Sequence, residues 1–292
     1  MVKKTFTEKA LAYTSLLSLK NIEDLEKVID WNIQNNITLY RMSSDMFPWI
    51  SEYEFENLPD IESIKKILSR IGKKIDNHNH RVTFHPGPFN VLASANENVV
   101  QKTIKELRQH GEVMDMMDLP RSPFSKINIH IGGAYGDKKT ALARFIKNFS
   151  SLPAAAARRI TVENDDKVNM FSVNDLLKVH HEIGIPIVFD YLHHQFCMGN
   201  LCEDEALELA VSTWPITIRP IVHYSSSKKK FEDPGALDAA HADFIYKPVL
   251  SHGHRVDIML EAKAKEQAVL RYIEQFRITT NSSETAHDNR TV

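Results

Sequence analysis

A short apolar stretch that ends in a carboxylate and two imidazoles constrains the fold of this chain more than any other feature. Residues 185–194, IPIVFDYLHH, begin as a buried strand and end in Asp190, His193 and His194. Short β-branched stretches bounded by Gly and Pro are typical of central strands in a parallel sheet. In α/β barrels, the residues that perform chemistry lie at the carboxyl ends of such strands.

The same pattern recurs along the chain. Further strands, each followed by polar or charged side chains, are predicted at residues 37–45, 80–90, 126–138, 159–166, 216–230 and 256–266. Helices are predicted from apolar spacing over residues 5–37, 60–74, 96–116, 138–149, 173–183, 203–212 and 264–277. Strands that alternate with helices in this way predict a parallel sheet with right-handed crossovers.

This alternation predicts an α/β fold of the TIM (β/α)8 barrel type, with its functional site at the C-terminal face of the barrel. Only seven strands are found in the sequence, whereas a closed barrel has eight, so we expect the first strand to be lacking or truncated. A single domain is expected over residues 1–278. Residues 279–292 have no periodic apolar pattern and are expected to form a disordered tail.

Composition excludes several classes of protein. An apolar content of 42% over 292 residues is enough to bury one large core. The chain has neither a run of about eighteen apolar residues nor the apolar centre of a signal peptide, so we expect a cytoplasmic protein without a membrane partner. Cys197 and Cys202 match no zinc motif and are expected to be unbridged. A net charge of −2 means that any nucleic acid must bind a local basic face.

Imidazole and carboxylate side chains gather at the predicted strand ends: His85, His130, Glu163, Asp190, His193, His223 and Glu261. Each of them alone has a structural explanation, such as a strand cap or a buried ion pair. Together they would share one bowl, where burial without counter-charge would cost many kcal/mol. Divalent metal ions resolve this cost, because imidazole and carboxylate are their usual ligands. The ligands are too many for one ion, so we expect two or three ions with Glu163 as a bridge, an arrangement that suits phosphodiester hydrolysis.

The chain resembles the UV damage endonuclease family in eight blocks over about residues 37–266: RMSSDMFPW, FHPGPF, IHIGGAYGDK, TVENDD, FDYLHH, VHYSSS, HADFI and DIMLEAKAKE. The resemblance implies a TIM barrel related to that of endonuclease IV. It also implies a nick immediately 5′ to a UV photoproduct, such as a cyclobutane dimer or a 6-4 product, with abasic sites as secondary substrates. The implied partner is double-stranded DNA, and the implied metal is Mn²⁺, although Zn or Co would also suit these ligands.

The resemblance further implies a role for each site residue. The implied ligands are His85 and His130 for one ion, Asp190, His223 and Glu261 for a second, and His193 and His241 for a third. Glu163 looks like the bridging carboxylate and is, with Lys263, an expected catalytic residue. Lys263 would face the scissile phosphate, although a solvated lysine explains it equally well. We also expect a nucleoid-associated monomer with no obligate protein partner.

The chain departs from the family at three points. The family inserts a glutamine and a tyrosine beside the lesion, and this chain has Pro88 and Phe89 there. Phe89 can still stack on an unpaired base, or it simply anchors the loop. Ile221 stands where the family commonly has a lysine that can be carboxylated and reach the metals. The Gly-Tyr strand with which the family begins is not found in the sequence.

Basic and hydroxyl side chains near the strand ends are candidates for phosphate contacts: Lys228, Lys229, Lys230, Arg41, Ser43 and Ser44. The lysine triplet is otherwise a solvated loop. Two other functions stay open, a sugar isomerase or epimerase with one metal and a non-catalytic protein that binds damaged DNA. We favour the endonuclease, because a one-metal enzyme leaves His85, His130 and the lysines unexplained.

Overall fold

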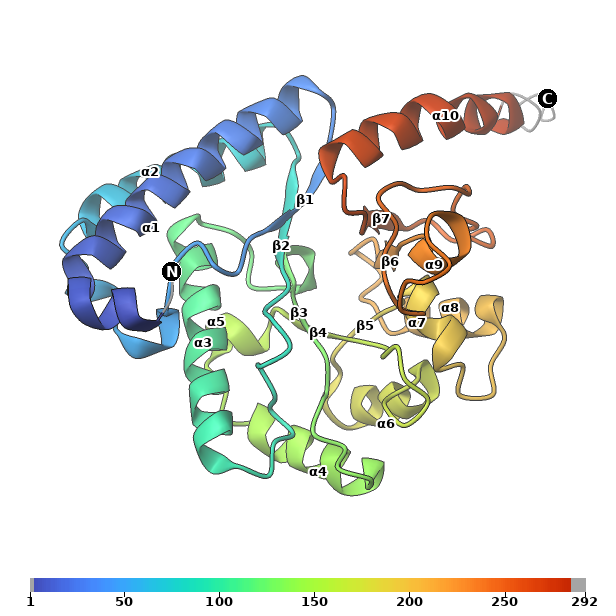
Figure 1. The fold of residues 1–292 in the computed structure, drawn as a ribbon, viewed down its shortest axis with the longest axis horizontal. Coiled ribbons are helices and arrows are strands. Elements are labelled where there is room, and N and C mark those ends of the chain that lie inside the picture. The colour runs from blue at the N-terminus through green and yellow to red at the C-terminus, as the bar shows by residue number, and fades with distance from the viewer. Residues whose placement is uncertain (1–2, 285–292) are drawn as a thin grey trace.

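Seven parallel strands form the centre of the protein in the computed structural model, which describes residues 3–284 (Figure 1). One sheet contains, in this spatial order, β1 (Leu39–Met42), β2 (Arg81–Phe84), β3 (Ile127–Ile129), β4 (Ile160–Glu163) and β5 (Ile187–Val188). A second sheet pairs β6 (Ile221–Tyr224) with β7 (Asp257–Leu260). All the strand pairs are parallel, as the alternation of strands and helices predicted.

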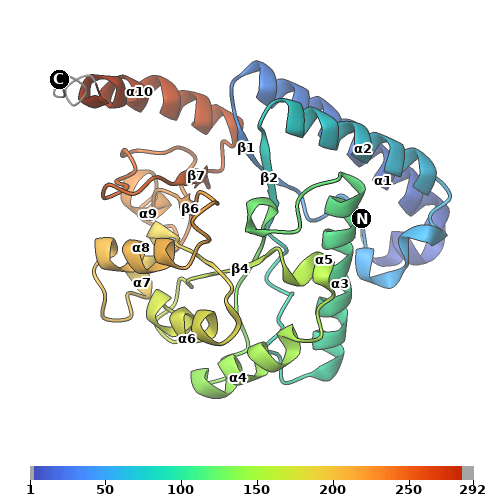
Figure 2. The same cartoon turned by 180° about the vertical axis from the view of Figure 1, so that it is seen from behind.

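Helices lie around the outside of the strands (Figures 1 and 2). In chain order they are α1 (Lys3–Gln34), α2 (Ile61–Asn77), α3 (Glu97–Met116), α4 (Lys138–Phe149), α5 (Ala154–Ala157), α6 (Val173–Ile183), α7 (Tyr191–Phe196), α8 (Glu203–Ser212), α9 (Lys228–Phe231) and α10 (Glu266–Glu284). Short 3-10 turns occur at Ile50–Glu52, Phe55–Asn57 and Pro123–Ser125. The architecture confirms a parallel α/β fold of the TIM-barrel type.

Local signals fix where a helix begins and ends. The side chain of Ser172 accepts a hydrogen bond from the backbone N–H of Asp175, and the carboxylate of Asp175 accepts one from the backbone of Ser172. This capping box starts α6, and Gly184 ends the helix with a φ of 71°. The strand β5 follows almost at once, and the chain is thereby brought to Asp190 at a defined place.

The two sheets meet at β5 and β6. The backbone N–H of His223 donates to the carbonyl of Phe189 at 2.9 Å, and Asp190 and His223 form an isolated parallel bridge. On the opposite side, β1 faces β7, and no backbone ladder joins these two strands within residues 3–284. We call these facing edges the β1–β7 seam. It lies where the first strand of an eight-stranded barrel would be inserted.

Side chains close the β1–β7 seam. Arg41 forms an ion pair with Glu261 at one end. At the other end, the buried guanidinium of Arg81 donates to Asp257 Oδ2 at 2.8 Å and to the carbonyl of Arg219 at 2.7 Å. Charged pairs therefore join the facing edges at both ends of the seam.

The C-terminal helix extends further than predicted. α10 projects away from the strands and continues to Glu284, into the segment that was expected to be a tail, while 285–292 lie outside the described residues (Figure 1). Cys197 and Cys202 are both free thiols. Among the described residues, no helix combines the length and the apolar character that a membrane crossing requires.

Candidate metal centre

The strand ends converge on one group of metal-binding side chains. These are His85 after β2, His130 after β3, Glu163 at the end of β4, Asp190 after β5, His193 in α7, His223 in β6, Glu261 after β7, and His241 in the loop between β6 and β7. We call these eight residues the ligand cluster. The parallel strands bring them together at one face, because parallel strands place their carboxyl ends at the same edge.

Glu163 lies at the centre of the ligand cluster and is only 1% exposed. Its Oε2 lies 3.1 Å from His85 Nε2 and 3.0 Å from His223 Nδ1, and its Oε1 lies 3.3 Å from His193 Nδ1. Three imidazoles from different parts of the chain thus face one carboxylate. This is the position that a bridging ligand needs.

Two ligand groups share Glu163. His85, His130 and Glu163 form one group, and Glu163, Asp190 and His223 form the other, each with its ligand atoms within 4.8 Å of one another. The first group contains both ligands predicted for one ion, and the second contains two of the three predicted for another, Asp190 and His223.

A further group involves Glu261. Its two carboxylate oxygens lie 3.1 Å from His223 Nδ1 and 3.7 Å from His241 Nδ1. The ring centroid of His241 is 6.4 Å from that of His193. All eight predicted ligands consequently occupy one continuous site.

Burial and charge set the protonation of these groups in opposite directions. Burial would raise the pKa of Glu163, but the neighbouring imidazoles, that of His223 foremost, outweigh burial and hold it well below its ordinary value. Burial raises the pKa of Asp190 to about 6 and lowers that of His85 to about 4. An ionised Glu163 beside a neutral His85 is the combination that binds a cation, because metal ligands must be deprotonated.

The other imidazoles respond to the carboxylates around them. Burial opposes protonation of His130, but a hydrogen bond with Asp165 and the charge of Glu163 outweigh it and raise the pKa of His130 to about 9. Burial is likewise outweighed at His193, where Asp190 and Glu163 raise the pKa to about 11. Both raised pKa values reflect the negative charge that the carboxylates bring into the ligand cluster.

The donor atoms fit a divalent metal ion. Asp190 is fully buried, and its Oδ1 accepts a hydrogen bond from the backbone N–H of His193 at 2.8 Å. Its Oδ2 has no hydrogen-bond partner among the described residues, although such a buried oxygen is costly to leave unpaired. A bound cation would relieve that cost. Nitrogen and carboxylate oxygen donors suit Mn²⁺, Zn²⁺ and Co²⁺ alike.

The basic residues expected to bind DNA are partly engaged by carboxylates. The lysine triplet, predicted to contact DNA and otherwise explained as a solvated loop, forms the short helix α9. Lys229 Nζ lies 2.6 Å from Asp238, and Lys228 Nζ lies 3.8 Å from Asp243. Lys230 Nζ lies 5.7 Å from the centre of the Phe231 ring, and Arg41 is paired with Glu261.

The remaining predicted site residues are exposed near the strand ends. Phe89 is 89% exposed in the turn after His85, and Pro88 precedes it. Lys263 lies in the turn after β7, where its backbone N–H donates to the carbonyl of Ala242, beside His241. Ser43 is exposed after β1.

Three supporting residues escaped the sequence analysis. Asn128 donates a hydrogen bond to Glu163 Oε2, Asp165 Oδ1 lies 3.0 Å from His130 Nδ1, and Lys126 Nζ lies 3.0 Å from His223 Nε2. The alternation of Lys126, Asn128 and His130 was a usable signal, because every second residue of a strand points to the same face. Asp165 was visible as a polar residue after β4, but no sequence rule pairs it with His130.

An interior lysine is present at a different position from the one expected. Ile221 is fully buried, and the amine of Lys126 reaches His223 from the start of β3. Burial lowers the pKa of Lys126 to about 7. His223 therefore has a lysine amine beside it, that of Lys126, although Ile221 stands where the family commonly has a lysine.

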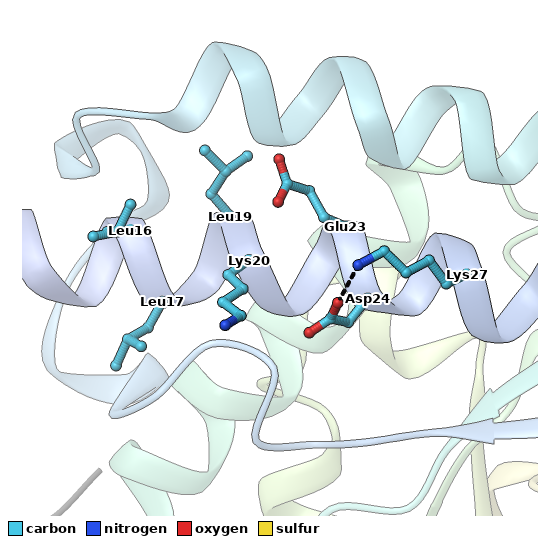
Figure 3. A pocket seen from close by; sticks show the side chains of 7 residues that line it. All are labelled: Leu16, Leu17, Leu19, Lys20, Glu23, Asp24 and Lys27. Carbon is cyan, nitrogen blue, oxygen red and sulfur yellow. Dashed lines mark hydrogen bonds and ion pairs between the residues drawn. The ribbon is translucent and has the colours of Figure 1, made fainter.

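A surface cavity elsewhere on the molecule is unrelated to this site. It is lined entirely by residues of α1, on the outer helical layer: Leu16, Leu17, Leu19, Lys20, Glu23, Asp24 and Lys27 (Figure 3). No strand end contributes a side chain to it. The ligand cluster therefore remains the candidate site.

Known proteins resemble this chain over most of its length. The sequence model of the family described as UV-endonuclease UvdE matches residues 2–287. A UV DNA damage endonuclease of Bacillus cereus (strain 03BB102) is 37% identical over 264 residues, which are 88% of this chain and 80% of that relative. A relative of the same name from Bacillus anthracis is 36% identical over the same shares.

Solved structures agree with the sequence relatives. The crystal structure of SacUVDE superposes with a TM-score of 0.79 at 33% identity, over 90% of this chain and 88% of that one. Endonuclease IV from Thermus thermophilus shares the fold, with a TM-score of 0.56 at 12% identity over 88% of this chain and 94% of its own. The family match and the identities lead to one conclusion: the chain belongs to the UV-endonuclease UvdE family.

Proposed function

We propose that this chain is a metal-dependent DNA repair endonuclease that nicks the backbone immediately 5′ to UV photoproducts. Its sequence relatives are named UV DNA damage endonucleases, which supports DNA cleavage as the reaction class. Cyclobutane dimers and 6-4 products are the proposed lesions, and abasic sites are the proposed secondary substrates. The observation that carries the proposal is Glu163, a buried carboxylate faced by three imidazoles at the shared end of the strands.

Two or three divalent ions, Mn²⁺ in our proposal, would supply positive charge for the phosphate and a lowered pKa for the attacking water. The chain divides the ligand cluster among them. Proposed ligands are His85 and His130 for one ion, Asp190, His223 and Glu261 for a second, and His193 and His241 for a third. Glu163 would bridge and thereby fix the spacing of the ions.

Residues around the ligand cluster would hold it in shape. Asn128 donates to Glu163 and accepts from the Thr161 hydroxyl at 2.7 Å, so the carboxylate has one preferred orientation. Asp165 orients the ring of His130 from the side of the following strand. Partners of this kind commonly change metal affinity or activity by about 10–100-fold when removed. Lys263, exposed after β7, is the proposed contact to the scissile phosphate.

Recognition of damage is assigned to the turn after β2. Phe89 extends into solvent directly beyond His85 and offers an aromatic face to an unpaired base. Bending and unstacking the duplex costs less where a lesion has already weakened pairing. Exposure of Phe89 beside the ligand cluster therefore favours lesion-dependent binding over binding to any duplex.

A labelled substrate tests the proposal. A 5′-labelled duplex with one thymine dimer is incubated with the protein and Mn²⁺, with EDTA and an undamaged duplex as controls. We expect one EDTA-sensitive cut immediately 5′ to the dimer and no cut in the undamaged duplex. Binding of the dimer duplex without any cut would instead favour the non-catalytic alternative. Turnover of an aldose sugar without DNA cleavage would favour the sugar isomerase or epimerase alternative.

A further inference from the structure

We propose that Tyr135 forms a second stacking contact with a base of the damaged duplex, beside the contact of Phe89, and so contributes to lesion specificity. This inference rests on the proposed function. It assigns a role to the loop between β3 and α4, which the ligand assignments leave unexplained beyond His130.

The loop holds Tyr135 in an unfavourable conformation that exposes its ring. Tyr135 has a φ of 44° and is 69% exposed. A positive φ is uncommon for a bulky residue, and such strain concentrates at functional sites. Gly132, Gly133 and Gly136 also have positive φ values. Four residues of this loop thus have a left-handed backbone, and Tyr135 is the one among them with a side chain.

The Tyr135 loop packs closely against the Phe89 loop. A side chain at Gly133 would meet the carbonyl of Ala93 at 2.6 Å, and one at Gly132 would meet Val91 at 2.9 Å. The backbones of the two loops therefore approach as near as glycine allows. Movement of one aromatic residue relative to the other is restricted by this contact.

Arg144 of α4 joins the same two loops. Its guanidinium donates to the carbonyl of Ala93 at 2.7 Å and to that of Gly133 at 2.6 Å. The guanidinium also lies 5.6 Å from the centre of the Tyr135 ring, where a cation interacts favourably with an aromatic face. One side chain thus fixes both loops and supports the ring from one side.

The position of the loop determines what Tyr135 can contact. His85 and His130 precede Phe89 and Tyr135 on neighbouring strand ends, and their rings are 5.5 Å apart. DNA held with its phosphate at the ligand cluster would lie across both loops. Val168 and Met198 are also exposed beyond β4 and β5, but neither has an aromatic face for a base.

Paired variants separate the ring from the loop. Tyr135→Asn removes the ring and retains the backbone conformation, because asparagine tolerates positive φ, whereas Tyr135→Phe retains the ring. Phe89→Ala serves as the comparison for a first stacking contact. Ile216→Asn, at an exposed site just before β6 at the opposite end of the strands, is the matched control.

Kinetics with the manganese-loaded protein give the first measurement. We expect Tyr135→Asn to lower kcat/KM for the dimer duplex by roughly tenfold, the size of one lost base stack. Its affinity for undamaged duplex should change far less, and Tyr135→Phe and Ile216→Asn should behave as the wild type. An unchanged kcat/KM in Tyr135→Asn would overturn the proposal.

Photo-crosslinking gives a measurement that a merely structural residue would not affect. Duplexes carry 5-iodouracil next to the dimer or opposite to it, and the adducts are located by mass spectrometry. We expect an adduct at Tyr135 that is absent in Tyr135→Asn. A lower kcat/KM together with a lower melting temperature and no Tyr135 adduct would assign the ring a structural role and overturn the proposal.

The wild type distinguishes this inference from the function on which it rests. If the wild type neither cuts nor prefers the dimer duplex, the proposed function fails and the inference fails with it. If the wild type cuts 5′ to the dimer and Tyr135→Asn cuts equally well, only the role of Tyr135 fails.

Discussion

Glu163 remains ionised in the protein interior because three imidazoles surround it. Its neighbours hold its pKa well below the ordinary value even though burial acts in the opposite direction. Removal of one partner from a buried charged group is costly, because the other charges are left uncompensated. We therefore expect nicking and metal binding to depend on the charge of residue 163 more than on its size.

Replacement of Glu163 by glutamine tests its role at constant size. We expect Glu163→Gln to reduce nicking by more than about a hundredfold, beyond the range typical of residues that only support a ligand. Metal content measured by elemental analysis should fall, and binding of damaged DNA should remain measurable. Glu182→Gln, at an exposed position on α6, is the control. Wild-type nicking by Glu163→Gln would refute the bridging role.

His80 links stability to pH outside the ligand cluster. It is 2% exposed just before β2, and burial lowers its pKa from 6.5 to about 4. His80 gains a proton below about pH 6.5 in the unfolded chain, but only near pH 4 in the folded chain. Its neutral form therefore contributes its whole share of the unfolding free energy above pH 6.5, and this share falls as the pH is lowered. Between pH 7 and pH 5, this amounts to about 2 kcal/mol.

Urea unfolding with EDTA present measures that contribution. The loss of unfolding free energy between pH 7 and pH 5 should be smaller by about 2 kcal/mol in His80→Leu than in the wild type. The exposed His181→Leu should lose as much as the wild type. Equal losses in all three proteins would show that His80 is not protonated on unfolding in this range.

Loops after strands, more than the strands themselves, give this site its shape. The loops after β2 and β3 interlock at Gly133, where any Cβ would lie 2.6 Å from the carbonyl of Ala93. Gly136, in the same loop, also has positive φ, but a Cβ there would meet nothing within 4 Å. The two glycines thus offer a comparison between backbone strain alone and strain combined with a steric clash.

Alanine at each position separates the two effects. Gly136→Ala should cost about 1 kcal/mol of unfolding free energy, from the left-handed backbone. Gly133→Ala should cost at least about 1 kcal/mol more, since the loops must move apart. It should also lower nicking, which Gly136→Ala should largely preserve. Denaturant unfolding and the thymine-dimer assay measure both effects, and equal costs would contradict the close packing of the loops.

The sequence predicted elements best where it carries explicit boundaries. Helices α4, α6 and α8 have the predicted limits, and α6 shows why, since a capping box and a glycine define its ends. The short helices α7 and α9 were not predicted, because six and four residues are too few for a periodic apolar pattern. As a result, the helical conformation of the lysine triplet was not predicted.

The site was predictable to the extent that topology determines it. Parallel strands bring their ends together whatever their register, so the six predicted ligands at or directly after strands do meet. His193 and His241 join them from α7 and from the loop between β6 and β7. Individual pairs such as Arg41 with Glu261 depend on register and rotamer, which a single sequence does not contain. The same reason explains why Lys126 and Asp165 were found only in the structure.

Residues from both sheets and the turns after their strands form the ligand cluster, so metal binding would be coupled to the stability of the whole molecule. His85, His130 and Glu163 lie at or directly after strands of the five-stranded sheet, whereas His223 and Glu261 lie at or directly after strands of the two-stranded sheet. An ion bound among them would connect the two sheets. A ligand that binds only the folded state stabilises it by about 2.7 kcal/mol at a hundred times its Kd.

Metal loading should accordingly raise the melting temperature. We expect Mn²⁺ to raise it by several degrees in a concentration-dependent manner, and EDTA to reverse the rise. Glu163→Gln should show a much smaller shift, because the link between the sheets is weakened. A wild-type melting temperature that is independent of Mn²⁺ would indicate that the ligand cluster does not bind this ion.

The barrel should open locally most easily at the β1–β7 seam. Opening a sheet normally breaks a row of backbone hydrogen bonds, but here the charged pairs of Arg41 and Arg81 replace that row. Breathing of the barrel should therefore begin at this edge, with faster amide exchange in β1 and β7 than in β3 and β4. Because Glu261 belongs to the moving edge, each such fluctuation changes the spacing of the ligand cluster itself. A metal ion bound in the ligand cluster would then be released through small openings, long before the barrel unfolds.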